Sequence, residues 1–464
     1  MNRKHLSILS GLVVLALVSL ACAFTLPGAD EVDSVATSVA ATVNALGGTS
    51  EDLPHAPSAD SPPDEEETLT PPVGGEAPLR VSFVSPDGDL YTWADGEASS
   101  TLLLASGDIS SSFISPDGTL VAFTRYSGYE FVALEVIGFD GSNRHTLLTA
   151  EQAALLPRPD GAVASEPDLL AWVPGTHSLS MSLRHSFEGP GLFRGEEFYI
   201  ADADAAGFYS LMETGSTTWQ FVWSPDGSKV AISNPTGLEI YSAAGAKIAG
   251  PVLTHPFINT ASEYAWTSYP IWSQDGGDLL VRVPPQDPWS GTGPEADSSL
   301  WRVAADGLSG ELIFSAPMQY NIRGDTGVSP DLEKILYLVR TGLPTENTYN
   351  LVVSNVDGSG SVFYATGYFM NTLAWSTDGE RFFYSLGDMP ASQPYIGQLG
   401  MPPAPVADFT NPMDVSWVDA NRYLVTTNEG GRRRLLMGSV GAPTGLIYDS
   451  LTPFDEQINF SVNR

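Results

Sequence analysis

Residues 111–126 read SSFISPDGTLVAFTRY, and the four central letters, SPDG at 115–118, recur at 85–88 and 224–227. Related turns with the letters SQDG, SPDL and STDG stand at 273–276, 329–332 and 376–379. Serine suits the first position of a tight turn, proline presets φ at the second, aspartate bonds back to the local backbone, and glycine takes the left-handed position. An alternating strand follows each copy, so each copy predicts a β-hairpin.

Half of the tryptophans mark the same point of this repeat. Two degenerate copies of the turn, WVPGTHS and WVDANR, begin at 172 and 417, and five of the ten tryptophans stand immediately before a turn: Trp172, Trp223, Trp272, Trp375 and Trp417. A large aromatic at one fixed point indicates a stacked architecture, because each unit must bury a face against its neighbour. Four strands in each unit of about 40 to 58 residues are typical of a β-propeller blade.

The whole pattern of an apolar residue or Trp, then SPDG, a strand, and a strand ending in a DG turn resembles the TolB-type, WD40-like propeller repeat of bacterial envelope proteins. The resemblance covers residues 79–464. It implies an all-β propeller that works outside the cytoplasm. Members of that family have varied binding and scaffolding roles, so the resemblance implies no activity.

The markers also predict the number of blades. Turns beginning at 115, 173, 224, 273, 329, 376 and 418 open seven blades, and RVSFVSPDGDLYTW at 80–93 begins a further blade that lacks its innermost strand. The C-terminal segment EQINFSV is a spare strand that completes this first blade and closes the ring. We therefore predict eight four-stranded antiparallel blades, with seven as the alternative.

The N-terminus carries an export signal. Arg3 and Lys4 precede an apolar segment over residues 6–20, which is too short for a comfortable membrane span. Residues 19–22, SLAC, resemble a bacterial lipoprotein box, which implies a signal peptide over 1–22 and lipidation of Cys22, the sole cysteine. Acyl chains on Cys22 would hold the chain in the cell envelope, outside the cytoplasm. Secretion after cleavage at Ala23 is the alternative.

Residues 23–78 predict a flexible tether. They contain eleven acids, eight prolines and no lysine or arginine, so they cannot bury enough apolar area to fold alone. The whole chain has a formal net charge of −34, which repels nucleic-acid phosphates and anionic lipid headgroups. We expect no nucleic acid as a partner, contact with the membrane through the lipid anchor alone, and a monomer.

The long loops predict a binding face. Within a blade, the first-to-second and third-to-fourth turns share one face, where the tight DG turns belong, and the other connections share the opposite face. Long loops at 149–167, 186–197, 284–299 and 341–348 all fall on this second face, as expected for a binding rim on a rigid scaffold. The ligand-binding candidates in these loops are Trp289, Asp287, Glu295, Asp297, Phe187, Phe193 and Arg194.

Catalytic and metal motifs give little signal. The chain has no G-x-S-x-G nucleophile elbow, and its histidines do not stand at metal-ligand spacing. Asp202 and Asp204 belong to a hairpin turn that lacks the glutamate of a calcium loop. We therefore expect no cofactor, with Ca²⁺ as the alternative that the sequence leaves open. No catalytic residue is assigned.

Two functions from different classes remain. The leading hypothesis is a lipid-anchored, non-enzymatic propeller that binds or scaffolds an envelope or extracellular protein or glycan. The alternative is a propeller enzyme, a glycan hydrolase or lyase, whose carboxylates from different blades converge on the central channel and act on extracellular polysaccharide.

Overall fold

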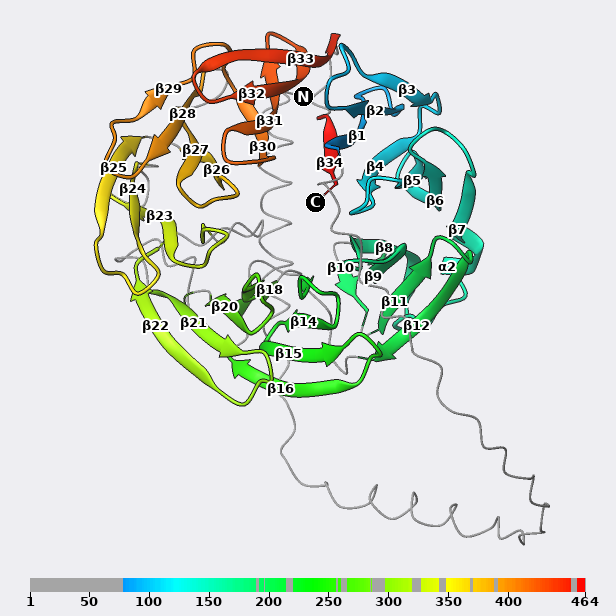
Figure 1. Ribbon diagram of the computed structural model, residues 1–464. Coiled ribbons are helices and arrows are strands. Elements are labelled where there is room, and N and C mark those ends of the chain that lie inside the picture. The colour runs from blue at the N-terminus through cyan, green and yellow to red at the C-terminus, as the bar shows by residue number, and fades with distance from the viewer. Residues whose placement is uncertain are drawn as a thin grey trace, which may run out of the picture. The chain divides into compact units, whose positions relative to one another are not determined.

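The computed structural model describes residues 78–188, 192–195, 197–213, 220–255, 258–259, 265–283, 285, 297–318, 327–341, 348–367, 370–387, 391–451 and 457–463. Residues Val73–Arg464 form one compact unit, which is a ring of antiparallel β-sheets around a central axis (Figure 1). The lipidation candidate Cys22 and the tether over 23–77 lie outside the described residues. Within the described ranges, no helix is long and apolar enough to cross a membrane.

The repeated turn closes through a fixed set of hydrogen bonds. In the copy at 115–118, the Ser115 hydroxyl donates to Asp117 Oδ1 (2.6 Å) and accepts from the Leu120 N–H (2.9 Å). Asp117 Oδ1 also accepts from the Thr119 N–H (3.1 Å), and Gly118 has φ +75°. The same bonds recur in the turns that begin at 224, 273, 329 and 376. Serine suits this turn because one hydroxyl both donates and accepts.

The sheets form eight blades, which confirms the predicted all-β propeller. Counted outward from the axis, blade 1 contains β34 (Asn459–Val462), β1 (Arg80–Val84), β2 (Leu90–Ala94) and β3 (Thr101–Leu104), and blade 2 contains β4 (Ile109–Ile114), β5 (Leu120–Ser127), β6 (Glu130–Gly138) and β7 (His145–Thr149). Blade 3 contains β8 (Ala162–Trp172), β9 (Ser178–Phe187), β11 (Glu197–Asp202) and β12 (Gly207–Glu213), with β10 (Leu192–Arg194) beside β9. Blade 4 contains β13 (Gln220–Trp223), β14 (Lys229–Asn234), β15 (Gly237–Ser242) and β16 (Lys247–Thr254).

In the same order, blade 5 contains β19 (Tyr269–Trp272), β20 (Asp278–Val283), β21 (Ser298–Ala304) and β22 (Gly310–Ala316), and blade 6 contains β23 (Lys334–Arg340), β24 (Tyr349–Asn355) and β25 (Val362–Gly367). Blade 7 contains β26 (Met370–Trp375), β27 (Arg381–Leu386), β28 (Gln393–Gln398) and β29 (Ala404–Pro405). Blade 8 contains β30 (Pro412–Trp417), β31 (Arg422–Glu429), β32 (Arg432–Ser439) and β33 (Ala442–Leu451). In blade 6 a single bridge between Val328 and Ile335 holds the innermost position. A hairpin of β17 (Ile258–Asn259) and β18 (Ala265–Trp266) precedes blade 5, and the short helix α2 (Ala150–Ala153) follows blade 2.

The C-terminal strand closes the ring, as predicted. β34 pairs with β1 from Val81↔Val462 to Val84↔Asn459, so blade 1 takes its innermost strand from the far end of the chain. Ser461 Oγ also accepts from the Ile114 N–H of blade 2 (3.1 Å). The alternative of seven blades is wrong, because blades 3 and 8, on which it depended, are both complete sheets.

The repeated tryptophans join neighbouring blades. The indole N–H of Trp417 donates to the Ala374 carbonyl on the innermost strand of blade 7 (3.0 Å), and Trp272 makes the same bond to the Val222 carbonyl of blade 4 (3.0 Å). Trp172, Trp223 and Trp375 likewise donate to the preceding blade. Each repeat therefore adds a specific hydrogen bond to the apolar contact that the sequence predicts.

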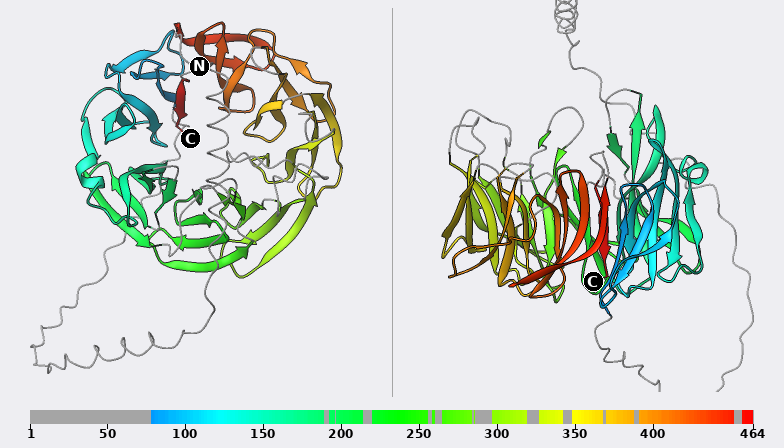
Figure 2. Two further views of the ribbon diagram at one scale, coloured as in Figure 1. Left: turned by 180° about the vertical axis from the view of Figure 1, so that it is seen from behind. Right: turned by 90° about the horizontal axis from the view of Figure 1, so that it is seen from above.

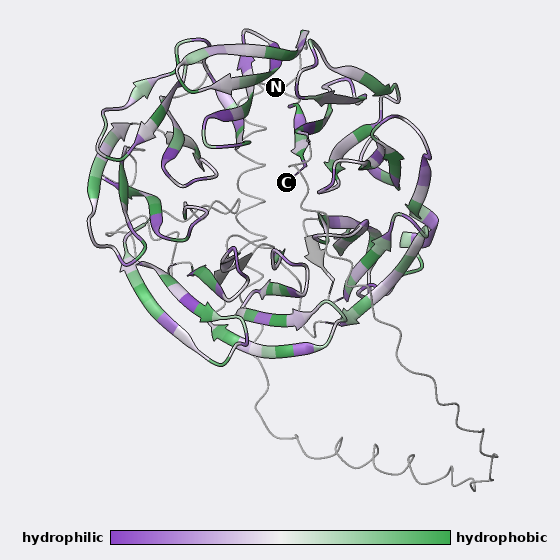
Figure 3. Ribbon diagram, in the orientation of Figure 1, coloured by the Kyte–Doolittle hydropathy of each residue, from purple (hydrophilic) through white to green (hydrophobic). Residues whose placement is uncertain are grey.

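Apolar side chains fill the spaces between the blades. Among the described residues, eight clusters of buried side chains lie one at each of the eight interfaces, including the interface between blades 8 and 1. Figure 3 shows hydrophobic segments in the strands all around the ring. The core is thus a circle of equivalent layers, as expected of a repeat architecture.

One prediction about the faces is wrong. The SPDG copy at 85–88 joins β1 to β2, the second and third strands of blade 1, so it lies on the face opposite the other copies. There the Gly88 carbonyl accepts from the Ile109 N–H (3.1 Å), and Asp89 Oδ1 accepts from the Ser106 N–H (2.8 Å) of the connection to blade 2. The turn chemistry specifies a hairpin, and does not specify which hairpin of the blade.

Candidate functional site

The two faces of the ring differ in what they carry. The tight-turn face holds the turns that follow the innermost strands, and Pro78 and Asn463 lie there together, with Asn463 Nδ2 donating to the Pro78 carbonyl (3.1 Å). The long-loop face holds the connections between blades. Both ends of the propeller therefore meet on the tight-turn face.

Blade 3 is lengthened on the long-loop face. Its innermost strand β8 has 11 residues, whereas the innermost strands β4, β13, β19, β26 and β30 have 6, 4, 4, 6 and 6. Its second strand β9 has 10 residues, whereas the second strands β5, β14, β20, β23, β27 and β31 have 8, 6, 6, 7, 6 and 8. β9 pairs with β11 only from Ser178 to Met181, and further along it pairs with β10 instead. We call residues 162–168, 182–187 and 192–194 the blade-3 extension. In the right view of Figure 2 it stands above most of the disc.

A charged pair lies on the blade-3 extension. Arg184 donates from Nε to Glu166 Oε1 (2.8 Å) and a second time through Nη2. Burial opposes the positive charge of Arg184, but the hydrogen bonds to Glu166 outweigh it and raise the pKa of Arg184. Beside this pair, burial and the charge of Glu166 raise the pKa of Tyr126 above its ordinary value. The Tyr126 phenol, the Glu166 carboxylate and the Arg184 guanidinium therefore lie close together where blades 2 and 3 meet.

A serine and a histidine meet inside the same extension. Ser165 Oγ lies 2.9 Å from His185 Nδ1, and the His185 side chain is only 1% exposed. A Cβ atom on Gly195, the residue after β10, would lie 3.0 Å from His185 Nε2, so the backbone at Gly195 covers this side of the ring. Burial lowers the pKa of His185. We interpret the pair as a structural contact, because a substrate cannot reach the imidazole in this arrangement.

Of the predicted binding residues, three lie in blade 3, one lies in blade 5, and three lie outside the described residues. Phe187 ends β9 and is half-buried, while Phe193 and Arg194 lie on β10 opposite His185 and Arg184 in register. Asp297 lies two blades away, just before β21, where it is exposed and Oδ2 accepts from Ser315 Oγ (3.4 Å). The remaining candidates, Asp287, Trp289 and Glu295, lie outside the described residues.

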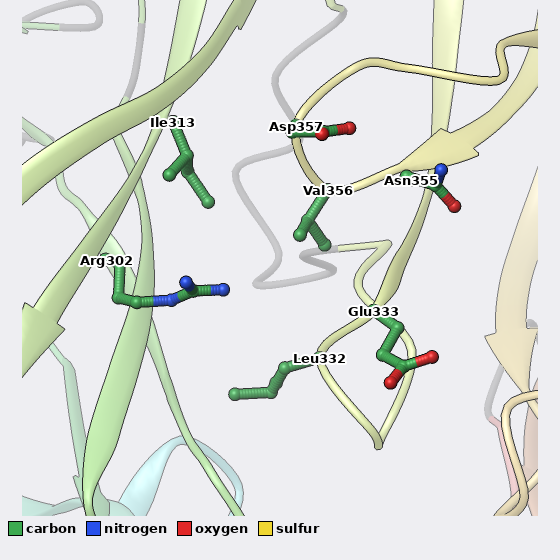
Figure 4. Close-up of a pocket in the computed structure, with 7 residues that line it drawn as sticks. All are labelled: Arg302, Ile313, Leu332, Glu333, Asn355, Val356 and Asp357. Atoms are coloured by element: carbon green, nitrogen blue, oxygen red, sulfur yellow. The ribbon is translucent and has the colours of Figure 1, made fainter.

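A pocket that the sequence did not predict opens between blades 5 and 6. It has a volume of about 380 Å³ and is formed by two elements of blade 5 and two turns of blade 6, with the lining residues Arg302, Ile313, Leu332, Glu333, Asn355, Val356 and Asp357 (Figure 4). The lining turns place it on the tight-turn face, away from the blade-3 extension. The one sequence signal is the leucine of SPDL at 329–332, which replaces the glycine of the other copies.

The central axis carries an unusual acid. Asp414 lies on β30, the innermost strand of blade 8, and solvent reaches its side chain. The surrounding protein nevertheless desolvates the carboxyl and raises the pKa of Asp414. Such a group holds its proton to a higher pH than an ordinary aspartate.

A histidine on the tight-turn face joins blades 2 and 3. His177 Nε2 lies 3.0 Å from Asp117 Oδ2, and His177 Nδ1 lies 3.0 Å from Asp204 Oδ1. The hydrogen bond to Asp117 contributes most to the raised pKa of His177, and Asp204 adds to it. No group of His, Cys, Asp or Glu in the described ranges has the arrangement of a metal site.

The comparisons with known proteins agree with the fold. No protein-family model and no curated protein matches the chain. Among solved structures, it is similar to TolB from Acinetobacter baumannii (11% identity, 84% of this chain and 67% of that chain covered, TM-score 0.35). It is also similar to the β-propeller domain of the Trilobed protease from Pyrococcus furiosus (15%, 75% and 99%, 0.45) and to oligogalacturonate lyase in complex with manganese (11%, 81% and 97%, 0.41). The eight-bladed sheet topology itself confirms the expected propeller fold. The three likenesses, all at TM-scores below 0.5, assign neither a family nor a function.

Proposed function

We propose that the chain is an extracytoplasmic binding module, held at a membrane surface by lipid on Cys22, whose long-loop face binds an envelope or extracellular protein or glycan without catalysing a reaction. The observation that carries the proposal is the blade-3 extension. β8 is nearly twice as long as the other innermost strands, and β9 is longer than the other second strands by two residues or more. This added length has no role in closing the ring, so it serves the surface that the strands reach.

The chemistry of the extension fits a partner of this class. Phe187 offers part of an aromatic ring at the end of β9, and the Arg184 and Glu166 side chains remain 35% and 13% exposed. Aromatic rings and guanidinium groups are the side chains that contribute most at binding surfaces. The ring beneath them is closed and joined blade to blade, which keeps this surface in place before a partner arrives.

The entry point of the chain supports the same orientation. Pro78, where the described part of the propeller begins, lies on the tight-turn face. A tether that joins at that face leaves the blade-3 extension free to meet a partner. The export signal and the acidic tether are the further support for a site outside the cytoplasm.

Crosslinking in cells tests the binding face. The full chain is expressed with the photoreactive residue p-benzoylphenylalanine in place of Phe187, and a matched control carries it in place of Leu308, an exposed residue on the tight-turn face. We expect a defined adduct, identified by mass spectrometry, from position 187 and not from 308. Equal adducts from both positions, together with no binding of the purified full chain to a panel of bacterial polysaccharides, would contradict the proposal.

The anchor has its own test. A Cys22→Ser variant of the full chain should move from the membrane fraction to the soluble fraction after cell lysis. A mature N-terminus at Phe24, measured by mass spectrometry of the wild type, would instead establish cleavage after Ala23 and a secreted protein.

A second function is favoured by Asp414. A carboxyl on the innermost strand of a propeller, with its pKa raised by burial, is the kind of group that serves as the general acid of a glycan hydrolase or lyase. If the chain is such an enzyme, the purified protein should release reducing ends from an extracellular polysaccharide, and Asp414→Asn should abolish the release. An unchanged rate in Asp414→Asn would exclude this role for Asp414.

A further inference from the structure

Two histidines join blades 2 and 3 on the tight-turn face. His145 is the first residue of β7, the outermost strand of blade 2, and His177 lies immediately before β9 of blade 3. β7 contacts both β11 and β12 across the interface, and Figure 1 shows these strands side by side at the rim. Each histidine reaches from its own blade to the other, so the two imidazoles are part of the same contact between blades.

Both ring nitrogens of His145 face carbonyl oxygens. Nδ1 lies 2.8 Å from the Asn143 carbonyl of its own turn, and Nε2 lies 2.9 Å from the Ala203 carbonyl in the turn between β11 and β12. A carbonyl oxygen only accepts hydrogen bonds, and a neutral imidazole has a single N–H. The two contacts of His145 are therefore both hydrogen bonds only when the ring carries two protons.

His177 has the same arrangement with carboxylates. Nε2 lies 3.0 Å from Asp117 Oδ2 of blade 2, and Nδ1 lies 3.0 Å from Asp204 Oδ1. Burial opposes the charge of Asp117, but hydrogen bonds from Ser115 and His177 outweigh it and lower the pKa of Asp117. The Thr119 hydroxyl, 3.3 Å from Nε2, also donates to Asp117 Oδ2 (2.8 Å). Two anionic acceptors on opposite sides of one ring favour the imidazolium.

The other charged groups beside the two histidines make contacts of their own. Asp202 Oδ1 accepts from two backbone N–H groups of the turn between β11 and β12 (2.9 and 3.1 Å). Arg144, which precedes His145, binds Glu135 Oε2 (2.7 Å), and Asp140 accepts a hydrogen bond within its own turn (2.6 Å). The protons that link the two blades at this point are thus those of the imidazole rings.

Other blade interfaces on the tight-turn face are linked by side chains that keep their charge. Arginine and lysine lose their proton only above about pH 10. These links run from Arg80 to the Gly118 carbonyl (2.9 Å), from Lys334 to Glu380 (3.2 Å), from Arg381 to the Ala420 carbonyl (2.9 Å) and from Arg422 to Asp95 (2.6 Å). Between blades 2 and 3 the same role falls to histidine, the side chain whose charge changes between about pH 5 and 8.

We propose that the contact between blades 2 and 3 is a pH-sensitive joint, which is closed when His145 and His177 each carry two ring protons and is loosened when either ring loses one. Loss of a proton places a nitrogen lone pair against a carbonyl or carboxylate oxygen, so a hydrogen bond is replaced by repulsion. The turn between β11 and β12 then loses its hold on blade 2, while the apolar cluster between the blades keeps the ring closed. The proposed location outside the cytoplasm exposes the joint to the pH of the surroundings, but the joint itself does not depend on that location.

Hydrogen exchange of the purified full chain tests the joint. Exchange is measured by mass spectrometry at pH 5.5 and 8.0, and each rate is divided by the intrinsic rate of the amide at that pH. We expect the protection of residues 202–207 to fall about tenfold from pH 5.5 to 8.0, because a charge-assisted hydrogen bond is lost. Residues 419–422, where Arg381 makes the corresponding link, should keep their protection. Equal protection of 202–207 at both pH values, or an equal fall at 419–422, would overturn the proposal.

Variants assign the pH response to the two rings. His145→Gln and His177→Gln should each reduce the response of residues 202–207, and the double variant should remove it, with protection at pH 5.5 close to the wild-type value at pH 8.0. The matched control is Arg381→Gln, which should lower the protection of residues 419–422 equally at both pH values. A pH response of residues 202–207 that persists in the double variant would refute the assignment.

The protonation of the rings can also be measured in the wild type. Correlation spectra of the chain labelled with ¹⁵N-histidine distinguish an imidazolium from a neutral ring, and the two single variants identify the signals of His145 and His177. We expect both rings to be imidazolium at pH 5.5 and at least one to be neutral at pH 8.0. A neutral ring at either position at pH 5.5 would contradict the geometry on which the proposal depends.

Discussion

The hydrogen bond between Trp417 and the Ala374 carbonyl predicts how far one indole stabilises a blade interface. Trp417 is 1% exposed, and its N–H reaches the innermost strand of blade 7 at 3.0 Å. Trp417→Phe keeps an aromatic ring but leaves a buried carbonyl without its donor, which costs about 1–3 kcal/mol. Trp417→Ala also removes the ring from the cluster between blades 7 and 8, which costs about 3–5 kcal/mol.

The control is Trp301→Phe. The Trp301 ring packs against the cluster between blades 4 and 5, as Trp417 packs between blades 7 and 8, but its indole N–H donates to Ser299 Oγ on its own strand (3.0 Å). The phenylalanine variant therefore removes no hydrogen bond between blades. Urea unfolding followed by circular dichroism gives the loss of stability, and hydrogen exchange locates it. We expect faster exchange in β26 and β30 of Trp417→Phe, and little change in Trp301→Phe. The reasoning is refuted if the two phenylalanine variants lose the same stability, or if exchange rises evenly around the ring.

Three further outcomes follow from the closure of the ring and from its charged turns. Deletion of residues 457–464 removes the innermost strand of blade 1, so we expect a lower thermal midpoint and a larger radius of gyration in solution scattering. The pKa of His177 is raised in the folded state, so the stability that His177 contributes is present below its unfolded pKa of about 6.5. That stability is lost as the pH rises through the folded pKa. Between pH 6 and 9, the thermal midpoint of His177→Gln should therefore fall less than that of the wild type. Hydrogen bonds from Ser224 and the Ser228 N–H lower the pKa of Asp226 to about 2. The stability that Asp226 contributes is therefore present above pH 3.8 and is lost as the pH falls toward 2. Asp226→Asn should flatten the fall in the thermal midpoint at acid pH.

The sequence by itself determined the blades, their number and the closure of the ring. The turn is readable because Ser115, Asp117 and Gly118 complete their bonds within six residues of chain, so the same letters give the same hairpin wherever they occur. The repeated tryptophans could be recognised in the sequence because the repeats bury the same position against the preceding blade. The spare C-terminal strand followed from counting, since blade 1 lacked one.

Only the tertiary structure decided where a ligand could bind. Arg302, Leu332 and Asp357 are separated by whole strands and belong to two different blades, so no spacing in the chain shows that they line one pocket. The blade-3 extension depends on β9 exchanging β11 for β10 as its partner, which is a matter of register. Local hydrogen bonds specify each hairpin, but a surface is made by the order in which hairpins pack, and that order is set by contacts between distant residues.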